Sequence, residues 1–298
     1  MSIASFDVIV VGAGPAGLTA ATGAARAGLK ALCLDKLAPG GALINLAELH
    51  EVEGHADGPQ IASQLTDEAT EAGVELGFGE VVKLTGSGPW TVETADGEQH
   101  TGRAVVIATG LSKGTLGLPE ESEYDGRGLS HCASCDGPLY AGRPVVVVGT
   151  EGWAPREAAE LQVVAGDVTV IGKPAAPLPD GVHHLDGRIV ALEGSDGLES
   201  VVVETSSGSG SESGGTRKTI PASAVFVYVG QSPAAEFLAE TLARDATGHI
   251  VVDEGCRTSA ATAFAVGDVR AGARHYLVDA IADGHRAGQA IVTALKKT

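Results

Sequence analysis

The sequence predicts an α/β fold, and two observations carry that prediction. Near the N-terminus an apolar run ends in a glycine-rich turn and continues into an alanine-rich stretch, and a similar order returns around Gly149. A strand, a tight glycine turn and a helix in this order open a strand–helix–strand unit. The chain therefore contains an internal duplication of two Rossmann-like, dinucleotide-binding-type domains. Its 298 residues suffice for two ordinary domains, and 44% of them are hydrophobic.

The first unit follows directly from the order of its segments. Residues 7–11 are apolar and predict a strand, residues 12–17 form the glycine turn, and residues 18–27 predict a helix. Residues 30–35 predict the second strand, which ends in the acidic Asp35. An acidic residue about 20 positions after the turn belongs to the dinucleotide-binding pattern.

The glycine turn supplies the first candidate binding residues. Glycines let the backbone approach a pyrophosphate closely, and the unpaired N–H groups at the start of the following helix favour an anion. A glycine turn in a fold that binds no nucleotide is the alternative interpretation. The candidates in this turn are Gly12, Gly14, Pro15, Ala16 and Gly17.

Further strands and helices are predicted along the rest of the chain. A strand over residues 104–110 breaks at a glycine, and a strand over 145–148 leads through Gly149 into a helix over 154–164. A third strand of that unit covers residues 167–171.

The C-terminal third contains a hairpin, two strands and a helix. Residues 205–216 consist almost wholly of Ser, Gly, Glu and Thr, which predicts the tip of a hairpin. Strands are expected at residues 224–230 and 264–268, the second ending in a turn. An amphipathic helix is predicted over residues 277–295.

The charge balance excludes some classes of partner. The chain has 38 acidic and 20 basic side chains, which gives a net charge of −18. Phosphate contacts need clustered Lys and Arg, so we expect neither nucleic acid nor an anionic membrane as a partner. No apolar stretch approaches the ~18 residues of a membrane helix, and the first residues lack the features of a signal peptide. The sequence therefore predicts a cytoplasmic protein.

Two of the four cysteines predict redox chemistry. Cys132 and Cys135 form a Cys-x-x-Cys pair, which in a cytosolic α/β chain is typical of a redox-active dithiol. His131 precedes the pair and Asp136 follows it, so a candidate proton carrier lies on each side. Zinc binding is the competing interpretation, but it needs four ligands and the sequence offers no second pair at ligand spacing. We therefore expect no metal.

Taken together, these motifs resemble the low-molecular-weight thioredoxin reductase family of FAD-dependent pyridine nucleotide-disulfide oxidoreductases. The resemblance implies an FAD-binding domain in two parts, residues 1–113 and 228–298, and a smaller inserted domain, residues 114–227, that carries the cysteine pair. It also implies a homodimer with one FAD per chain. The matching landmarks are residues 12–17, Gly40-Gly41, Ala108-Thr109-Gly110, Cys132-Ala-Ser-Cys-Asp-Gly137, residues 226–230 and Gly267-Asp268.

The same resemblance assigns roles to individual residues. The first glycine turn faces the FAD pyrophosphate, Asp35 the ribose and Asp268 the phosphate arm next to the flavin's sugar alcohol. Cys135 faces the flavin, Cys132 meets the substrate sulfur, and Asp136 shuttles protons. His131 is unusual at its position, and we interpret it as a candidate base acting on substrate thiols. The remaining cofactor-binding candidates are Gly41, Ala108, Thr109, Gly110, Gly267, His275 and Tyr276.

His275-Tyr276 stands where the family has an Arg-Gln pair. The functional interpretation is an altered flavin edge or substrate wall, and the alternative is ordinary packing at the start of a helix.

The second glycine turn departs from the family pattern. The family has a run like Gly-Gly-Gly-Asp-Ser-Ala that holds NADPH, whereas Thr150 and Glu151 follow Gly149 here. A carboxylate about 4 Å from a phosphate repels it by roughly 4 kcal/mol at an effective dielectric constant of 20. The family's His-Arg-Arg cluster after the next strand is replaced by a segment with one cation, Lys173. The end of that strand also lacks the acidic residue that would indicate a preference for NAD. The sequence therefore predicts a degenerate NADPH site.

If NADPH cannot deliver electrons, they must come from another donor or flow in the reverse direction. The main prediction is an FAD-dependent dithiol oxidase that closes an intramolecular disulfide in a small-molecule dithiol, with oxygen as acceptor and hydrogen peroxide as product. This resembles the flavoenzymes of the gliotoxin, holomycin and romidepsin pathways, which places it in antibiotic biosynthesis. One alternative is a thioredoxin-reductase-like disulfide reductase that uses NADPH or another donor such as ferredoxin. An alternative of another class is a non-catalytic flavin-binding or metabolite-sequestering protein.

Overall fold

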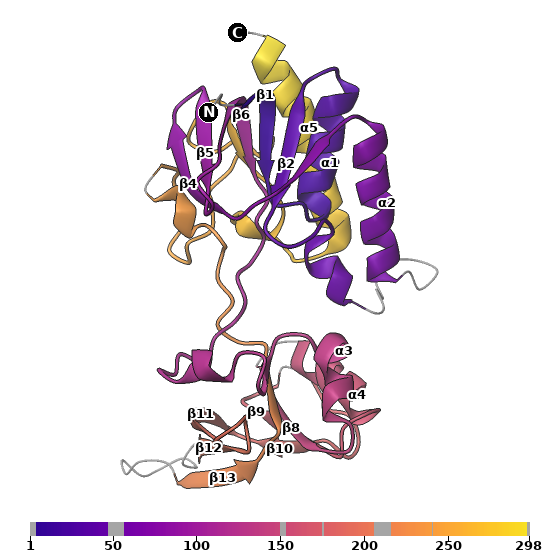
Figure 1. The fold of residues 1–298 in the computed structure, drawn as a ribbon, viewed down its shortest axis with the longest axis vertical. Helices are drawn as coiled ribbons and strands as arrows, with labels where there is room; N and C mark the ends of the chain where they lie inside the picture. The colour runs from indigo at the N-terminus through magenta and orange to yellow at the C-terminus, as the bar shows by residue number, and fades with distance from the viewer. Residues whose placement is uncertain are drawn as a thin grey trace. The chain divides into compact units, whose positions relative to one another are not determined.

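The chain folds into two compact units, described separately below (Figure 1). The structure is a computed structural model that describes residues 4–46, 57–149, 153–174, 176–205, 216–239 and 241–296. The first unit joins Met1–Ser112 to Ser232–Thr298, and the second is Lys113–Gln231.

The first unit is built on a seven-stranded sheet with strand order β3-β2-β1-β6-β5-β4, in which β15 also pairs with β6. The central strand β1 pairs in parallel with β2 and β6, and β5 runs antiparallel to both β6 and β4. The strands are β1 (Ala4–Val11), β2 (Ala31–Asp35), β3 (Glu75–Phe78), β4 (Val81–Gly86), β5 (Trp90–Thr94), β6 (Gln99–Ile107) and β15 (Ala263–Ala265).

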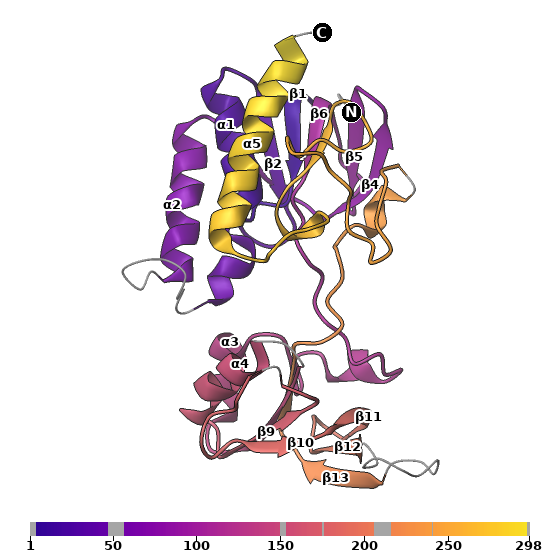
Figure 2. The same cartoon turned by 180° about the vertical axis from the view of Figure 1, so that it is seen from behind.

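Helices cover one face of this sheet. Helix α1 (Pro15–Arg26) packs against both α2 (Gly58–Glu71) and α5 (Leu277–Lys296) (Figure 2). Side chains alternate between the two faces of a strand. In β1, Val8 and Val10 accordingly join the core beneath the helices, whereas Ile9 and Val11 join a second core on the other face.

The second unit contains a five-stranded parallel sheet with order β10-β9-β8-β14-β7 and a separate antiparallel sheet with order β11-β12-β13. Strand β8 is buried on both faces, as an apolar run in a parallel sheet should be. Its elements are β7 (Leu129–Ser130), α3 (Ala133–Asp136), β8 (Pro144–Val148), α4 (Trp153–Gln162), β9 (Asp167–Ile171), β10 (His183–Leu185), β11 (Gly187–Glu193), β12 (Ser200–Thr205), β13 (Arg217–Pro221) and β14 (Ala224–Val227).

Short 3-10 helices complete the described part of the chain. Two lie at glycines that the sequence analysis singled out, Gly41 and Gly267. They are η1 (Gly41–Asn45), η2 (Glu121–Tyr124), η3 (Gly137–Tyr140), η4 (Glu236–Leu238) and η5 (Gly267–Val269).

Most predicted elements are present, with shifted ends. The first helix begins at Pro15 rather than Leu18, because proline suits the first helical position and Gly14 serves as N-cap. The strand expected over residues 104–110 is the longer β6. Strands β12 and β13 pair as a hairpin, but most of its predicted tip, residues 206–215, lies outside the described residues.

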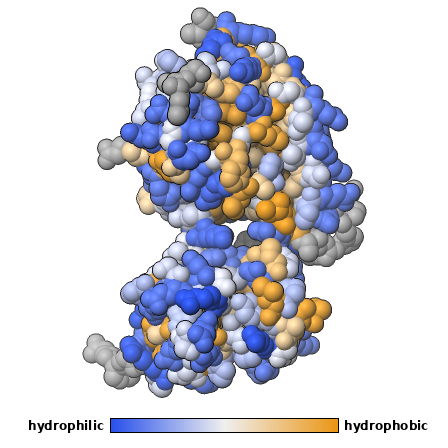
Figure 3. Space-filling view, in the orientation of Figure 1, coloured by the Kyte–Doolittle hydropathy of each residue, from blue (hydrophilic) through white to orange (hydrophobic). Residues whose placement is uncertain are grey.

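Apolar side chains are exposed in both units. On the face drawn in Figure 3, hydrophobic residues gather at several positions among hydrophilic ones. Exposed large hydrophobic side chains include Phe78 and Val82 in the first unit and Leu139 and Val163 in the second. Among the described residues, no helix combines the length and the apolar character needed to traverse a bilayer.

Candidate active site

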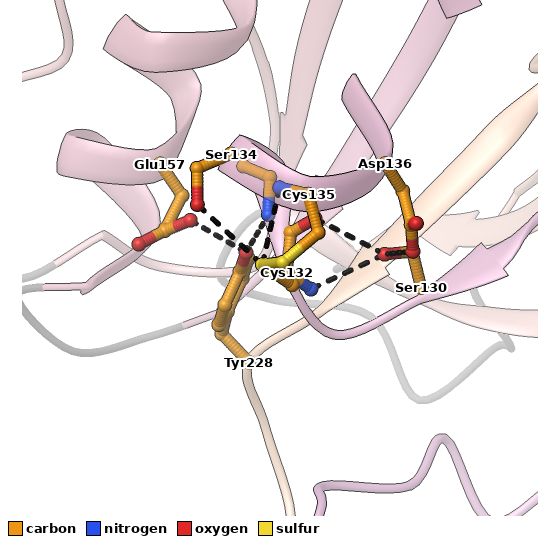
Figure 4. The surroundings of a disulfide bond; sticks show 8 residues. Ser130, Cys132, Ser134, Cys135, Asp136, Glu157 and Tyr228 are labelled. Atoms are coloured by element: carbon orange, nitrogen blue, oxygen red, sulfur yellow. Dashed lines mark hydrogen bonds between the residues drawn. A yellow bond between two sulfur atoms is a disulfide. The ribbon is translucent and has the colours of Figure 1, made fainter. Parts of the chain in front are cut away.

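Cys132 and Cys135 form a disulfide at the start of α3, with their Cα atoms 5.4 Å apart (Figure 4). Cys132 is the N-cap residue of this short helix. The Cys135 N–H donates to Cys132 Sγ at 3.2 Å, and the Asp136 N–H donates to the Cys132 carbonyl oxygen at 3.1 Å. A hydrogen bond to a sulfur favours its ionised form. The turn is therefore built to support a Cys132 thiolate once the disulfide opens.

Ser130 links Asp136 to the backbone of the cysteine pair. Its hydroxyl donates to Asp136 Oδ2 at 2.7 Å and accepts the Cys132 N–H at 3.2 Å. Ser130 is buried at the end of β7. The structure thus holds Asp136 beside the disulfide through a residue that the sequence analysis did not identify.

A second link reaches the opposite side of the turn. The buried Ala133 N–H donates to the Tyr228 hydroxyl at 3.0 Å, and that hydroxyl donates to Glu157 Oε2 at 2.6 Å (Figure 4). Glu157 is only 6% exposed. Burial raises the pKa of the Glu157 carboxyl, and the hydrogen bond from Tyr228 offsets part of that rise. Burial also raises the pKa of the Tyr228 hydroxyl, so Tyr228 remains the donor.

His131 makes a contact that its predicted role did not anticipate. Its Nε2 lies 2.8 Å from the carbonyl oxygen of Gly114. A carbonyl oxygen can only accept, so Nε2 carries a proton and donates it. The imidazole therefore binds the segment that enters the second unit, and its action on substrate thiols stays a prediction.

The three glycines of the first turn have different tasks. A Cβ atom on Gly12, where φ is +103°, would lie 2.4 Å from the Ala108 carbonyl oxygen, and one on Gly17 would lie 2.0 Å from the Gly12 carbonyl oxygen. A Cβ atom on Gly14 would have no neighbour nearer than the Gly41 Cα at 4.0 Å. Gly12 and Gly17 therefore allow the turn to pack, whereas Gly14 leaves space for a ligand at the start of α1.

The carboxylate of Asp35 lies beside this turn. Its Oδ2 accepts the Ala13 N–H at 2.8 Å and its Oδ1 accepts the Leu37 N–H at 2.9 Å. Each carboxylate oxygen keeps a second lone pair that can accept a ribose hydroxyl. The open glycine, the helix N-terminus and this carboxylate together fit the FAD that the resemblance implies. Pro15 and Ala16 are the first two residues of α1.

The remaining predicted cofactor residues fall into two places. Gly41 lies against Gly14, since its Cβ atom would be 3.0 Å from the Gly14 Cα. Ala108 and Thr109 follow β6, and the Thr109 hydroxyl donates to the Ala234 carbonyl oxygen at 2.6 Å. The next residue is Gly110, whose φ of +65° turns the chain.

The other place is the turn at Gly267. His275 Nδ1 lies 3.4 Å from Asp268 Oδ1, and Tyr276 is exposed just before α5. The buried Asp283 supports the turn, because its carboxylate accepts the Gly267 N–H at 3.1 Å and pairs with two arginines, Arg270 and Arg286. The sequence analysis missed Asp283, which lies in the middle of an amphipathic helix.

The described residues include only part of the second glycine turn. Thr150 and Glu151 lie outside the described residues, so the repulsion expected from Glu151 stays a prediction. A Cβ atom on Gly149 would lie 2.8 Å from the Ala154 Cβ, so this glycine serves the packing of β8 against α4. At the end of β9, the Lys173 ammonium lies 3.7 Å from the Asp186 carboxylate.

Similarity over most of the chain decides its family. The family model for pyridine nucleotide-disulphide oxidoreductases matches residues 6–295. This chain belongs to that family. It is 34% identical over 295 residues to a thioredoxin reductase of Listeria monocytogenes, covering 95% of this chain and 92% of the relative. A thioredoxin reductase of Treponema pallidum is 34% identical over 296 residues, with 96% and 95% covered.

Solved structures agree. The fold matches the crystal structure of Lactococcus lactis thioredoxin reductase in the FR conformation with a TM-score of 0.89 at 29% identity, covering 98% of this chain and 100% of the other. The predicted α/β class and the resemblance to low-molecular-weight thioredoxin reductases are therefore confirmed. The family member described here is a thioredoxin-reductase-like thiol/disulfide oxidoreductase with FAD as its cofactor.

Proposed function

We propose that this chain is a disulfide reductase of the thioredoxin reductase type. The observation that carries the proposal is the Cys132–Cys135 disulfide, held beside Asp136 in a chain that aligns over nearly its whole length with thioredoxin reductases. The same similarity ranks this function above the dithiol oxidase that the sequence analysis preferred. Its substrate is then a thioredoxin-type protein disulfide rather than a small dithiol.

The exchange needs two sulfurs and two protons. In the reduced pair, the Cys132 thiolate attacks one sulfur of the substrate disulfide, forms a mixed disulfide and releases the first substrate thiolate. Cys135 then attacks Cys132 Sγ, which closes the Cys132–Cys135 disulfide and releases the second thiolate. We assign the proton transfer at these sulfurs to Asp136, whose carboxylate accepts a hydrogen bond from Ser130. FAD, when bound, would supply the two electrons that are needed, together with two protons, to reduce the pair again.

The domain assignment follows from the same proposal. The unit that contains β1 and the first glycine turn holds FAD through the open space at Gly14 and the carboxylate of Asp35. The unit of Lys113–Gln231 carries the exchanging sulfurs. We propose a homodimer, as the resemblance implies.

The dithiol oxidase remains a second candidate for one specific reason. Lys173 is the one cation in residues 172–177, which follow β9; its side chain is 77% exposed, and it pairs with Asp186. A lone exposed lysine binds a nucleotide 2′-phosphate less well than paired guanidinium groups. This argues for a weak NADPH site and keeps two other electron routes open, from a donor such as ferredoxin or from substrate dithiol to oxygen.

One set of measurements separates these functions. FAD-loaded protein is mixed anaerobically with NADPH, and in a parallel sample with reduced ferredoxin, before oxidised thioredoxin is added and new thiols are counted. If the protein is a reductase, NADPH or reduced ferredoxin should bleach the flavin, and new thiols should appear on thioredoxin. Peroxide from aerobic incubation with a small dithiol, without bleaching by either donor, would establish the oxidase instead. Cys132→Ser and Cys135→Ser must abolish either activity, whereas flavin binding without either activity indicates a non-catalytic protein.

A further inference from the structure

Three segments of the second unit meet at the peptide between the two cysteines. Ala133 belongs to α3, Glu157 to α4, and Tyr228 directly follows β14. Their contacts form a chain from the buried Ala133 N–H through the Tyr228 hydroxyl to the Glu157 carboxylate. Figure 4 shows the Tyr228 hydroxyl pointing toward the disulfide turn.

The order of donors gives this chain a direction. An N–H can only donate, so the Tyr228 oxygen must accept from Ala133, and its own proton must go to another acceptor. Glu157 Oε2, 2.6 Å away, is that acceptor. A distance of 2.6 Å is typical of a hydroxyl that donates to a carboxylate. Glu157 therefore fixes the rotation of the Tyr228 hydroxyl and thereby presents its lone pair to Ala133.

The two redox states of the cysteine pair depend differently on this contact. In the disulfide form, the covalent bond between Cys132 and Cys135 itself closes the turn. In the dithiol form that constraint is gone, and the turn relies on hydrogen bonds. The Ala133 N–H bond is present while the disulfide is closed and ties the turn to two other segments, so it holds the backbone in the geometry that the disulfide needs.

We propose that Tyr228 and Glu157 are positioning residues for the exchange, and that they favour the disulfide form by holding the Ala133 N–H in the geometry of the closed turn. The inference rests on thiol–disulfide exchange at Cys132 and Cys135 as proposed above. It does not depend on the electron donor or on the direction of electron flow.

The test is the redox equilibrium of the pair in the FAD-loaded full chain. Protein is equilibrated anaerobically with mixtures of reduced and oxidised dithiothreitol at about pH 6.5, where an ordinary cysteine thiol stays protonated. Free Cys132 and Cys135 are then alkylated and counted by mass. A neutral hydrogen bond contributes about 0.5–1.5 kcal/mol. Tyr228→Phe should therefore shift the equilibrium by up to about tenfold toward the dithiol.

Two substitutions at Glu157 test the role of its carboxylate. Glu157→Ala removes the acceptor of the Tyr228 proton and should shift the equilibrium in the same direction by a smaller factor. Glu157→Gln keeps an acceptor oxygen and should restore a value close to that of the parent. Because Glu157→Ala leaves the tyrosine intact, the series gives an answer even where Tyr228→Phe does not fold.

Two variants serve as matched controls. Tyr140→Phe removes a hydroxyl from another tyrosine of the same hydrophobic core, and Glu160→Gln changes another carboxylate of α4. Both should leave the equilibrium unchanged. Melting temperatures that fall equally in the oxidised and reduced forms of Tyr228→Phe, with an unchanged equilibrium, would show that the contact only stabilises the fold and would overturn the proposal. If the variants show the expected shift but the parent protein does not reduce thioredoxin, the proposed function is refuted and the positioning role is kept.

Discussion

The Ser130 hydroxyl donates a 2.7 Å hydrogen bond to the Asp136 carboxylate and accepts the N–H of Cys132 at 3.2 Å. One buried side chain therefore fixes both the carboxyl group assigned to proton transfer and the backbone of the first cysteine. Thiol exchange depends on the geometry of both groups, because a displaced proton carrier or sulfur slows the reaction strongly.

Ser130→Ala is expected to slow the exchange without loss of FAD. The change leaves Asp136 without its serine donor and the Cys132 N–H without its acceptor, at a cost of about 1–3 kcal/mol. We expect the reaction of the pre-reduced protein with an aromatic disulfide dye to slow by roughly tenfold, as measured by stopped-flow absorbance. Ser122→Ala, at an exposed serine of η2, is the control. An unchanged rate in Ser130→Ala would remove Ser130 from the mechanism.

Two glycine variants should separate binding from folding. Gly14→Ala places a methyl group in open space, so the apoprotein should keep its melting temperature, whereas FAD affinity should fall by about 1–3 kcal/mol through overlap with the ligand. Gly17→Ala places a methyl group 2.0 Å from the Gly12 carbonyl oxygen and should prevent normal folding. Flavin content after purification and thermal unfolding of the apoprotein measure the two effects. Equal flavin content in Gly14→Ala and the parent would contradict the assignment of the site.

Sequence patterns revealed the parts of the fold that depend on neighbouring residues. The turn at residues 12–17 and Asp35 belong to one strand–helix–strand unit, so their spacing predicts that they lie together, and Asp35 indeed accepts the Ala13 N–H. Cys132 and Cys135 are likewise close in sequence. By contrast, the strand β7, which contains Ser130, has only two residues and is too short to give any periodic pattern.

The missed residues of the site are distant in sequence from what they contact. Tyr228 lies within the run of residues 224–230 that predicts a buried strand, and Glu157 looks like an ordinary charged residue of a helix. Only the packing of β14, α3 and α4 brings these two side chains to Ala133, which is 95 residues from Tyr228. The stabilising role of Asp283 is hidden in the same way, because its arginine and glycine partners are identified only by tertiary contacts.

The four cysteines should react in two classes. Cys33 and Cys256 are free and buried, and burial raises the pKa of both thiols, so little reactive thiolate forms. After reduction, an alkylating reagent at neutral pH should modify Cys132 and Cys135 quickly in the native protein, and all four cysteines only in denaturant. Peptide mass spectrometry locates the labels, and the double variant Cys132→Ser/Cys135→Ser should show almost no fast labelling. Rapid native labelling of Cys33 would contradict this assignment.

The pH dependence of stability should carry a signature of Glu157. Because burial raises its pKa in the folded state above the ordinary 4.5, the folded protein binds more protons than the unfolded chain between the two values. The free energy of unfolding therefore falls as pH rises through that window, and the penalty is fully present above the raised pKa. Glu157→Gln cannot titrate and escapes it.

We therefore expect the parent to lose stability relative to Glu157→Gln as the pH rises above 4.5. Urea unfolding of both proteins at each pH measures the difference, and taking the difference between the proteins cancels the titration of all groups that they share. Glu160→Gln removes one negative neighbour that helps to raise the Glu157 pKa, so it should reproduce only part of the change. A difference that stays constant with pH would mean that Glu157 has the same proton affinity in the folded and unfolded chain. Its burial against Tyr228 would then carry no electrostatic cost.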